Sequence, residues 1–114
     1  MKAIIELGRK GNVFAVARGQ IASPQEPDYH LSFESARTLF SMLTPARIDL
    51  LETLRRMGPC SIYALAKQAD RNYSNVHTDV ARLVELGLIE RAEDETVYVP
   101  FEEITIRLPL ALAA

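Results

Sequence analysis

Isoleucine- and valine-rich segments predict strands near both ends of the chain. Residues 2–7 (KAIIEL) and 13–18 (VFAVAR) flank a glycine-rich segment at 8–12. Two β-prone runs around such a turn predict a β-hairpin. We expect a third short strand at 29–33 (YHLSF), and either a last strand or an extended arm at 104–110 (ITIRLPL).

The middle of the chain changes to a helical period. Apolar residues there recur at spacings of three and four, which places them on one side of a helix. Four segments show this spacing: Ala36, Leu39, Phe40 and Leu43; Ile48, Leu51 and Leu54, flanked by Leu50 and Met57; Ile62, Leu65, Ala66 and Ala69; Val76, Val80 and Leu83.

Capping residues and breakers separate these helices. Thr44, Ser61 and Asn72 each stand where a side-chain oxygen can accept from the first free amides of a helix. Gly87 is expected to end the last helix in a left-handed conformation. The last two helices are then separated only by a tight turn at Asp70-Arg71.

A β-hairpin is predicted after the last helix. Residues 88–91 and 97–99 are its expected strands, and 92–96 is the turn between them. Two helices joined by a tight turn form a helix-turn-helix, whose second helix can enter a DNA major groove. The hairpin makes this motif a winged helix.

The predicted fold class is therefore α+β, in three parts. These are an N-terminal β-hairpin extension at 1–31, a winged helix-turn-helix at 32–100 and a C-terminal strand or arm at 101–114. A length of 114 residues with 48% hydrophobic and 25% charged residues suits one soluble globular chain. Because no apolar run approaches the ~18 residues of a membrane span and no signal peptide is recognisable, we expect a cytoplasmic location.

Five short motifs lie between Leu43 and Pro100. They are Leu43-Thr44…Arg47, Ser61-Ile62…Leu65-Ala66, Asn75-Val76-His77…Asp79-Val80, Leu83…Leu86-Gly87-Leu88-Ile89 and Val97…Val99-Pro100. This run resembles the winged helix-turn-helix regulators of the MarR/ArsR-like superfamily. Within that group it is most similar to a family of small DNA-binding proteins of archaea and bacteria. The resemblance implies a sequence-specific DNA-binding transcriptional regulator, and we expect a repressor that acts as a homodimer.

Two positions depart from the pattern of these relatives. Asp70 stands in the turn where relatives often have glycine, and Ser74 or Thr78 stands where they often have a basic residue. Aspartate tolerates left-handed geometry better than most residues, so we expect the turn to persist. The second departure bears on affinity for DNA.

The helix at 73–86 is the expected recognition helix. Asparagine bonds adenine through two atoms, serine and threonine reach base edges or phosphates, and arginine suits phosphates. The amides at a helix N-terminus also favour an anion. The candidate DNA-binding residues are Arg71, Asn72, Tyr73, Ser74, Asn75, His77, Thr78 and Arg82.

Structural roles compete for several of these residues. Asn72 is first of all a helix cap. Asn75 and Asp79 are candidates for hydrogen bonds within the domain. Tyr63 is expected to be a partly buried packing aromatic. We expect no metal or cofactor, because Cys60 is the only cysteine and the two histidines, His30 and His77, lie in different segments.

The charge balance limits the expected DNA contacts. The chain has a net charge of −2, and residues 44–100 carry seven bases against nine acids. Three consecutive acids, Glu93-Asp94-Glu95, occupy the expected hairpin tip and would repel phosphate. We therefore expect weak non-specific binding, and two protomers on a palindromic site.

The apolar segments outside the winged helix leave two alternatives open. They cover the domain's own core, or they build a homodimer through strand edges. A second hypothesis for function is an antitoxin that sequesters a toxin and regulates its own operon, and a third is a winged helix that serves only in assembly. We do not expect an enzyme, because no nucleophile–base set or phosphate-binding loop is recognisable.

Overall fold

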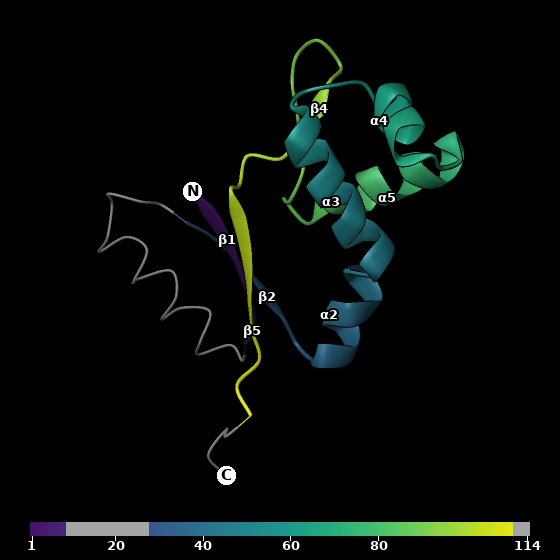
Figure 1. Ribbon diagram of the computed structural model, residues 1–114. Coiled ribbons are helices and arrows are strands. Elements are labelled where there is room, and N and C mark those ends of the chain that lie inside the picture. Colours follow the sequence, from purple (N-terminus) through teal and green to yellow (C-terminus); the bar gives the residue numbers. More distant parts are fainter. Residues whose placement is uncertain (9–27, 111–114) are drawn as a thin grey trace. The chain divides into compact units, whose positions relative to one another are not determined.

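The computed structural model describes residues 1–8 and 28–110. Within these residues it forms an α+β fold of four helices, a three-stranded sheet and a two-stranded ladder (Figure 1). Its elements are β1 (Lys2–Leu7), β2 (Tyr29–Phe33), α2 (Ala36–Met42), α3 (Pro45–Met57), α4 (Ile62–Ala69), α5 (Tyr73–Glu85), β3 (Glu90–Arg91), β4 (Val97–Tyr98) and β5 (Glu103–Arg107). The predicted α+β class is confirmed.

The chain divides into two compact units. The sheet unit comprises Met1–Met42 and Glu103–Ala114, and the helical unit comprises Leu43–Glu102. Helix α2 thus belongs with the sheet, whereas α3, α4, α5 and the β3–β4 ladder form the other unit. None of the described helices has the length and apolar character needed to cross a bilayer.

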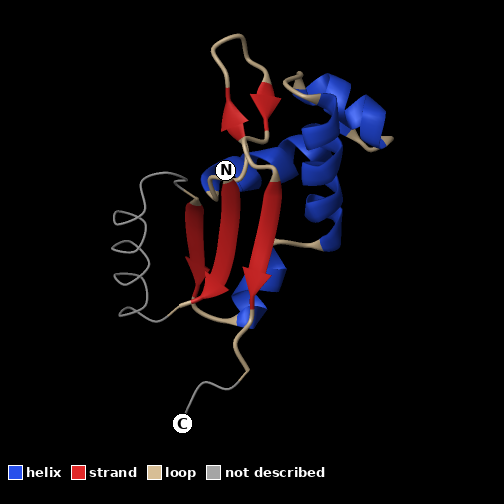
Figure 2. Cartoon of the chain, turned by 60° about the vertical axis from the view of Figure 1, so that its left-hand side comes forward, coloured by secondary structure: helices blue, strands red, loops and turns tan. Residues whose placement is uncertain are grey.

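Strand β1 lies at the centre of the sheet unit. It pairs in parallel with β2 on one edge and with β5 on the other, and all three strands run the same way in Figure 2. The strands predicted at 29–33 and within 104–110 are therefore confirmed. The prediction that residues 2–7 pair within an N-terminal hairpin is wrong, because β2 and β5 occupy both edges of β1. Its expected second strand, 13–18, lies outside the described residues.

The two faces of this sheet differ in polarity. Directly paired residues share a face, so Ala3 lies beside Ile104 and Ile5 beside Ile106. Ala3 and Ile5 are fully buried. The opposite face carries polar groups, among them Glu6 and His30, whose Oε1 and Nδ1 atoms lie 3.6 Å apart.

Helix α2 begins after a local cap. The Oγ atom of Ser35 accepts a hydrogen bond from the amide of Thr38 at 3.2 Å. Leu39 is fully buried, as its spacing predicts. Phe40, which the spacing places on the same side of the helix as Leu39, is 49% exposed. The buried stripe of this seven-residue helix is narrower than the sequence pattern suggests.

The helices of the other unit begin at the predicted caps. The Oγ1 atom of Thr44 accepts from the Arg47 amide at 3.3 Å, and Pro45 fills the first helical position. The Oγ atom of Ser61 accepts from the Ala64 amide at 3.1 Å. Both caps are therefore confirmed, because capping depends on neighbours in sequence.

The buried stripe of α3 is rotated from the predicted one. Leu50, Leu51 and Leu54 are buried, whereas Ile48 is 39% exposed. The sequence pattern places Ile48 on one side with Leu51 and Leu54, and Leu50 at its flank. Both stripes fit a helical period, and the structure buries the one that contains Leu50, Leu51 and Leu54.

The predicted hairpin is present as β3 and β4. Glu90 pairs with Tyr98 and Arg91 with Val97 in an antiparallel ladder. Val97 also forms an isolated antiparallel bridge with Cys60, through N–O distances of 3.1 and 2.8 Å. This bridge ties the hairpin to the connection between α3 and α4. Burial raises the pKa of the Cys60 thiol.

Candidate nucleic-acid interface

Three residues join α4 to α5. Asp70 adopts left-handed dihedral angles, with φ 54° and ψ 48°, and its amide donates to the Lys67 carbonyl at 3.1 Å. The amide of Arg71 donates to the Ala66 carbonyl at 3.0 Å. The prediction that Asp70 supports a left-handed turn is confirmed. Gly87, with φ 79°, likewise follows the end of α5 as predicted.

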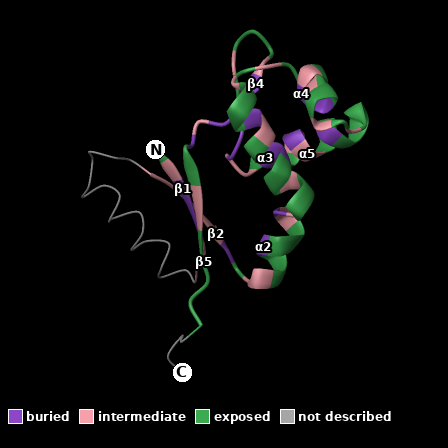
Figure 3. Cartoon of the chain, in the orientation of Figure 1, coloured by how far each residue is buried: buried purple, intermediate pink, exposed green. Residues whose placement is uncertain are grey.

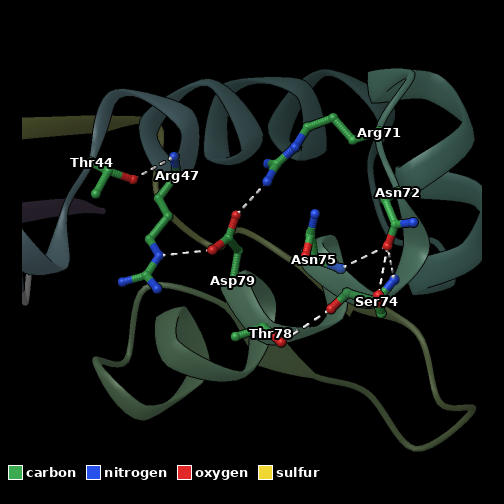
Figure 4. Close-up of polar contacts among 8 residues, drawn as sticks. All are labelled: Thr44, Arg47, Arg71, Asn72, Ser74, Asn75, Thr78 and Asp79. Carbon is green, nitrogen blue, oxygen red and sulfur yellow. Dashed lines mark hydrogen bonds and ion pairs between the residues drawn. The ribbon is translucent and has the colours of Figure 1, made fainter.

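Asn72 caps α5 with a single oxygen atom. Its Oδ1 accepts from the amides of Ser74 at 2.9 Å and Asn75 at 3.2 Å, and from the Ser74 hydroxyl at 2.6 Å (Figure 4). The predicted cap is therefore confirmed. It stabilises the first turn of α5 and fixes where the polar side chains of that turn begin.

Helix α5 has one apolar and one polar side. Val76, Val80 and Leu83 are fully buried. The remaining surface of the helix is largely exposed in Figure 3. The exposed candidates on it are Tyr73, Ser74, Asn75, His77, Thr78 and Arg82. The fold thus gathers these six predicted residues on one helix without burying any of them.

Three of the exposed hydrogen-bonding side chains are engaged locally, Ser74 through its bond to Asn72. The Thr78 hydroxyl donates to the Ser74 carbonyl at 3.1 Å, one turn earlier. Arg82 lies 3.2 Å from a carboxylate oxygen of Glu85. Both contacts are at the surface, where such pairs are worth well under about 1 kcal/mol. A ligand could therefore replace them at little cost.

Asn75 differs from these residues. Its amide side chain has no hydrogen-bond partner among the residues that the structure describes, although its backbone N–H is held by Asn72. An exposed carboxamide with both donor and acceptor free suits the paired acceptor and donor of adenine. The alternative role weighed for Asn75, a structural side-chain hydrogen bond, is therefore not observed in the described part.

Asp79 takes that structural role and joins three elements. Its Oδ1 accepts from Nε of Arg47 in α3 at 3.0 Å, and its Oδ2 accepts from Nη2 of Arg71 in the turn at 2.7 Å (Figure 4). The three side chains are 14%, 16% and 30% exposed, respectively. We call this cluster the Asp79 triad. It fixes α5 to both α3 and the preceding turn.

The charges of the triad determine the ionisation of Asp79. Burial by itself would raise the pKa of this carboxyl group. The hydrogen bonds and positive charges of Arg71 and Arg47 outweigh that effect, so the pKa of Asp79 lies below its ordinary value. Asp79 is therefore ionised at neutral pH and balances one of the two arginine charges.

This geometry turns the guanidinium group of Arg71 toward the protein. Its Nη2 binds Asp79, and its Nη1 is buried with no hydrogen-bond partner in residues 1–8 and 28–110. Arg71 is one of the residues expected at a DNA phosphate. In this structure its main contact positions α5.

A cation that is not among the predicted candidates lies nearby. Lys67 has its Nζ atom 5.7 Å from the centre of the Tyr63 ring. Tyr63 is 62% exposed, so the prediction that this aromatic side chain is partly buried is wrong. Its ring centre lies 6.5 Å from that of Tyr73, and the Tyr73 ring 5.9 Å from that of His77. The spacing of Tyr63 and Lys67, four residues apart on one helix, was the available signal.

Tyr63, Lys67 and Tyr73 border a hollow between α4 and the start of α5. Its volume is about 560 Å³. It is lined by Tyr63, Ala66, Lys67, Asp70, Arg71, Asn72 and Tyr73. The hollow thus combines the exposed cation Lys67 with the amino end of α5, where the helix dipole is positive.

The hairpin tip is acidic and exposed. Glu93, Asp94 and Glu95 are all exposed, and Glu95 has a positive φ of 65°. The Thr96 hydroxyl donates to Asp94 at 2.6 Å, which together with the Thr96 amide lowers the pKa of the Asp94 carboxyl. The tip thus carries negative charge at neutral pH.

No grouping of three or more histidine, cysteine, aspartate or glutamate side chains suited to a metal ion occurs among the described residues. The exposed polar surface of α5, with the hollow beside it, is the site that this geometry offers for a ligand.

Comparison with known proteins places the chain in a family. The profile of the HVO_A0114 family matches residues 42–106, which is more than half of the chain, and the chain belongs to this family. The matched region runs from the end of α2 to the penultimate residue of β5 and includes all of α5. No curated protein and no solved structure is significantly similar to the chain.

Proposed function

We propose that the helical unit is a winged helix-turn-helix that binds DNA, and that the chain represses transcription by occupying an operator. One observation carries this proposal. Helix α5 follows α4 after a capped turn of three residues, and its exposed side bears only polar and aromatic candidates near its amino end. A helix presented in this way fits a major groove.

Different side chains on and near α5 suit contacts with bases and with phosphates. Asn75, whose amide is free, pairs with adenine, and Ser74 and Thr78 reach neighbouring base edges. Lys67 and the positive end of the α5 dipole attract a backbone phosphate, which requires positive charge. The Asp79 triad does not contact DNA and holds α5 in the orientation that makes these contacts.

The hairpin takes a limited part in this binding. The bridge between Cys60 and Val97, with the bond from Arg55 Nη1 to the Val99 carbonyl at 3.1 Å, fixes its base to the helices. The acids at its tip would repel phosphate at close range. The tip therefore lies away from the DNA backbone. Because one protomer makes few cationic contacts, a homodimer on a two-fold symmetric site supplies the remainder.

Selection from a pool of random DNA duplexes tests this proposal. The full-length protein should enrich an inverted repeat whose half-sites are centred one helical turn, or a multiple of it, apart. Recovery of unrelated sequences at every salt concentration would contradict it. A pool bound by a protein carrying the substitution Asn75→Ala is the matched control, and its enriched motif should lose preference at an adenine position.

A second function is favoured by the acidic hairpin tip. Three exposed acids in a row complement a basic protein surface, and such charge pairs guide association. The partner would be a basic protein such as a toxin, with the present chain as its antitoxin. Co-purification with the product of an adjacent reading frame, abolished by Glu93→Lys with Glu95→Lys, would support this function. Unchanged co-purification would rule out the tip as the contact.

A further inference from the structure

Strand β5 forms an edge of the three-stranded sheet. Of the strands that the structure describes, only β1 pairs with it. In a parallel ladder, alternate residues direct their N–H and C=O groups to the other side. An edge of this kind is a template for another strand. The apolar side chain of Ile106 at this edge is 36% exposed.

The sequence of β5 is complementary to itself when reversed. It reads Glu103, Ile104, Thr105, Ile106 and Arg107. We infer that β5 of a second copy of this chain pairs with it in antiparallel orientation, about a two-fold axis through Thr105. Glu103 then lies opposite the partner's Arg107, and Arg107 opposite the partner's Glu103.

The faces of the sheet agree with this register. Ile104 lies opposite the partner's Ile106, on the face that already holds the buried Ala3 and Ile5. The apolar face thus continues across the two-fold axis and covers Ile106. The charged pairs fall on the opposite face, which carries Lys2 and Glu6 beside the buried Ile4.

Other registers lose this match. A shift of one residue sets isoleucine against polar positions and reverses the faces. A shift of two residues toward one end places Glu103 opposite Thr105, and a shift toward the other end places Arg107 opposite Thr105. In both cases neither charge meets its opposite. Pro109, two residues beyond β5, lacks the N–H needed to extend the ladder.

This inference deepens the homodimer of the proposed function by naming its surface, and it can fail separately from DNA binding. Opposite charges placed across an antiparallel pair stabilise it, and like charges destabilise it. Glu103→Lys makes both charged positions of β5 positive, whereas Arg107→Glu makes both negative. Each variant alone should be mainly monomeric, with a dimer dissociation constant raised roughly tenfold or more.

Mixing the two full-length variants provides the decisive experiment. The positive strand of one complements the negative strand of the other, so the mixture should form heterodimers, seen by native mass spectrometry and sedimentation. Each variant also alters a neighbour in its own sheet, because Glu103 lies beside Lys2 and Arg107 beside Glu6. These effects are the same before and after mixing, so heterodimer formation reports the interface alone.

The controls are Glu52→Lys and Arg56→Glu, which reverse exposed charges on α3. They should dimerise as the unmodified chain does. A monomeric unmodified chain, variants that dimerise as well as the controls, or a mixture without heterodimers would overturn the inference. If heterodimers form but no DNA motif is selected, the β5 interface stands and the proposed function fails. If a DNA motif is selected by a dimer whose stability these substitutions do not change, the proposed function stands and the β5 interface fails.

Discussion

The Oδ2 atom of Asp79 accepts a hydrogen bond from Nη2 of Arg71 across 2.7 Å, which ties α5 to the turn before it. The other carboxylate oxygen binds Arg47 of α3, 32 residues earlier in the chain. One carboxylate therefore sets the position of α5 against two other parts of the helical unit. The orientation of the exposed side chains of α5 depends on this position.

Removing the charge of Asp79 should destabilise the helical unit. In Asp79→Asn, two largely buried arginines lose their counter-charge, and hydrogen bonds to charged groups contribute about 1.5–3 kcal/mol. We expect the free energy of unfolding in urea to fall by that amount. Glu85→Gln, which removes an exposed acid of the same helix, should change it by less than about 0.5 kcal/mol. Equal stability of the two variants would show that the triad contributes nothing.

The triad should also make stability depend on pH in the acidic range. The folded-state pKa of Asp79 is lowered below the unfolded value of about 3.9. The resulting stabilisation is complete above that unfolded value and is lost as the pH falls through the folded-state pKa. The difference in unfolding free energy between the unmodified chain and Asp79→Asn should therefore be constant from pH 7 to 5 and shrink below pH 4. A difference that stays constant down to pH 2 would contradict the lowered pKa.

Asn72 allows the capping role to be separated from DNA binding. Asn72→Ala removes the acceptor of three hydrogen bonds and should cost about 1 kcal/mol of stability, measured by urea unfolding. Asn72→Asp keeps the acceptor and should retain the stability. The same substitution adds a negative charge at the amino end of α5, so it should weaken DNA binding. If Asn72→Asp bound DNA as tightly as the unmodified chain, no DNA phosphate would lie at the amino end of α5.

Local features of the fold could be predicted from the sequence. The caps at Thr44, Ser61 and Asn72 and the left-handed residues Asp70 and Gly87 all follow from chemistry within a few residues. The spacing of apolar residues correctly predicted that Val76, Val80 and Leu83 of α5 are buried. Such features require no knowledge of which segments meet in space.

Long-range pairing could not be predicted in the same way. Strand β1 pairs with β5, about 100 residues away, and a parallel pair leaves no turn in the sequence to mark it. The Asp79 triad likewise depends on the packing of α3 against the turn. For this reason the sequence predicts Arg71 at a phosphate and gives no sign of its bond to Asp79. The exposure of Tyr63 has the same origin, because α4 turns this residue outward.

The central claim is that the exposed side of α5 reads DNA sequence. Its most direct test is fluorescence anisotropy of binding to the selected duplex and to a scrambled duplex, at one stated salt concentration. The unmodified chain should bind the selected duplex at least about 10³-fold more tightly. The double substitution Asn75→Ala and Thr78→Val should reduce this preference by about 1–3 kcal/mol, whereas Arg56→Ala on α3 should leave it unchanged. The account would be contradicted if the unmodified chain bound both duplexes with equal affinity. It would also be contradicted if the α5 double variant kept the same preference for the selected duplex as the unmodified chain.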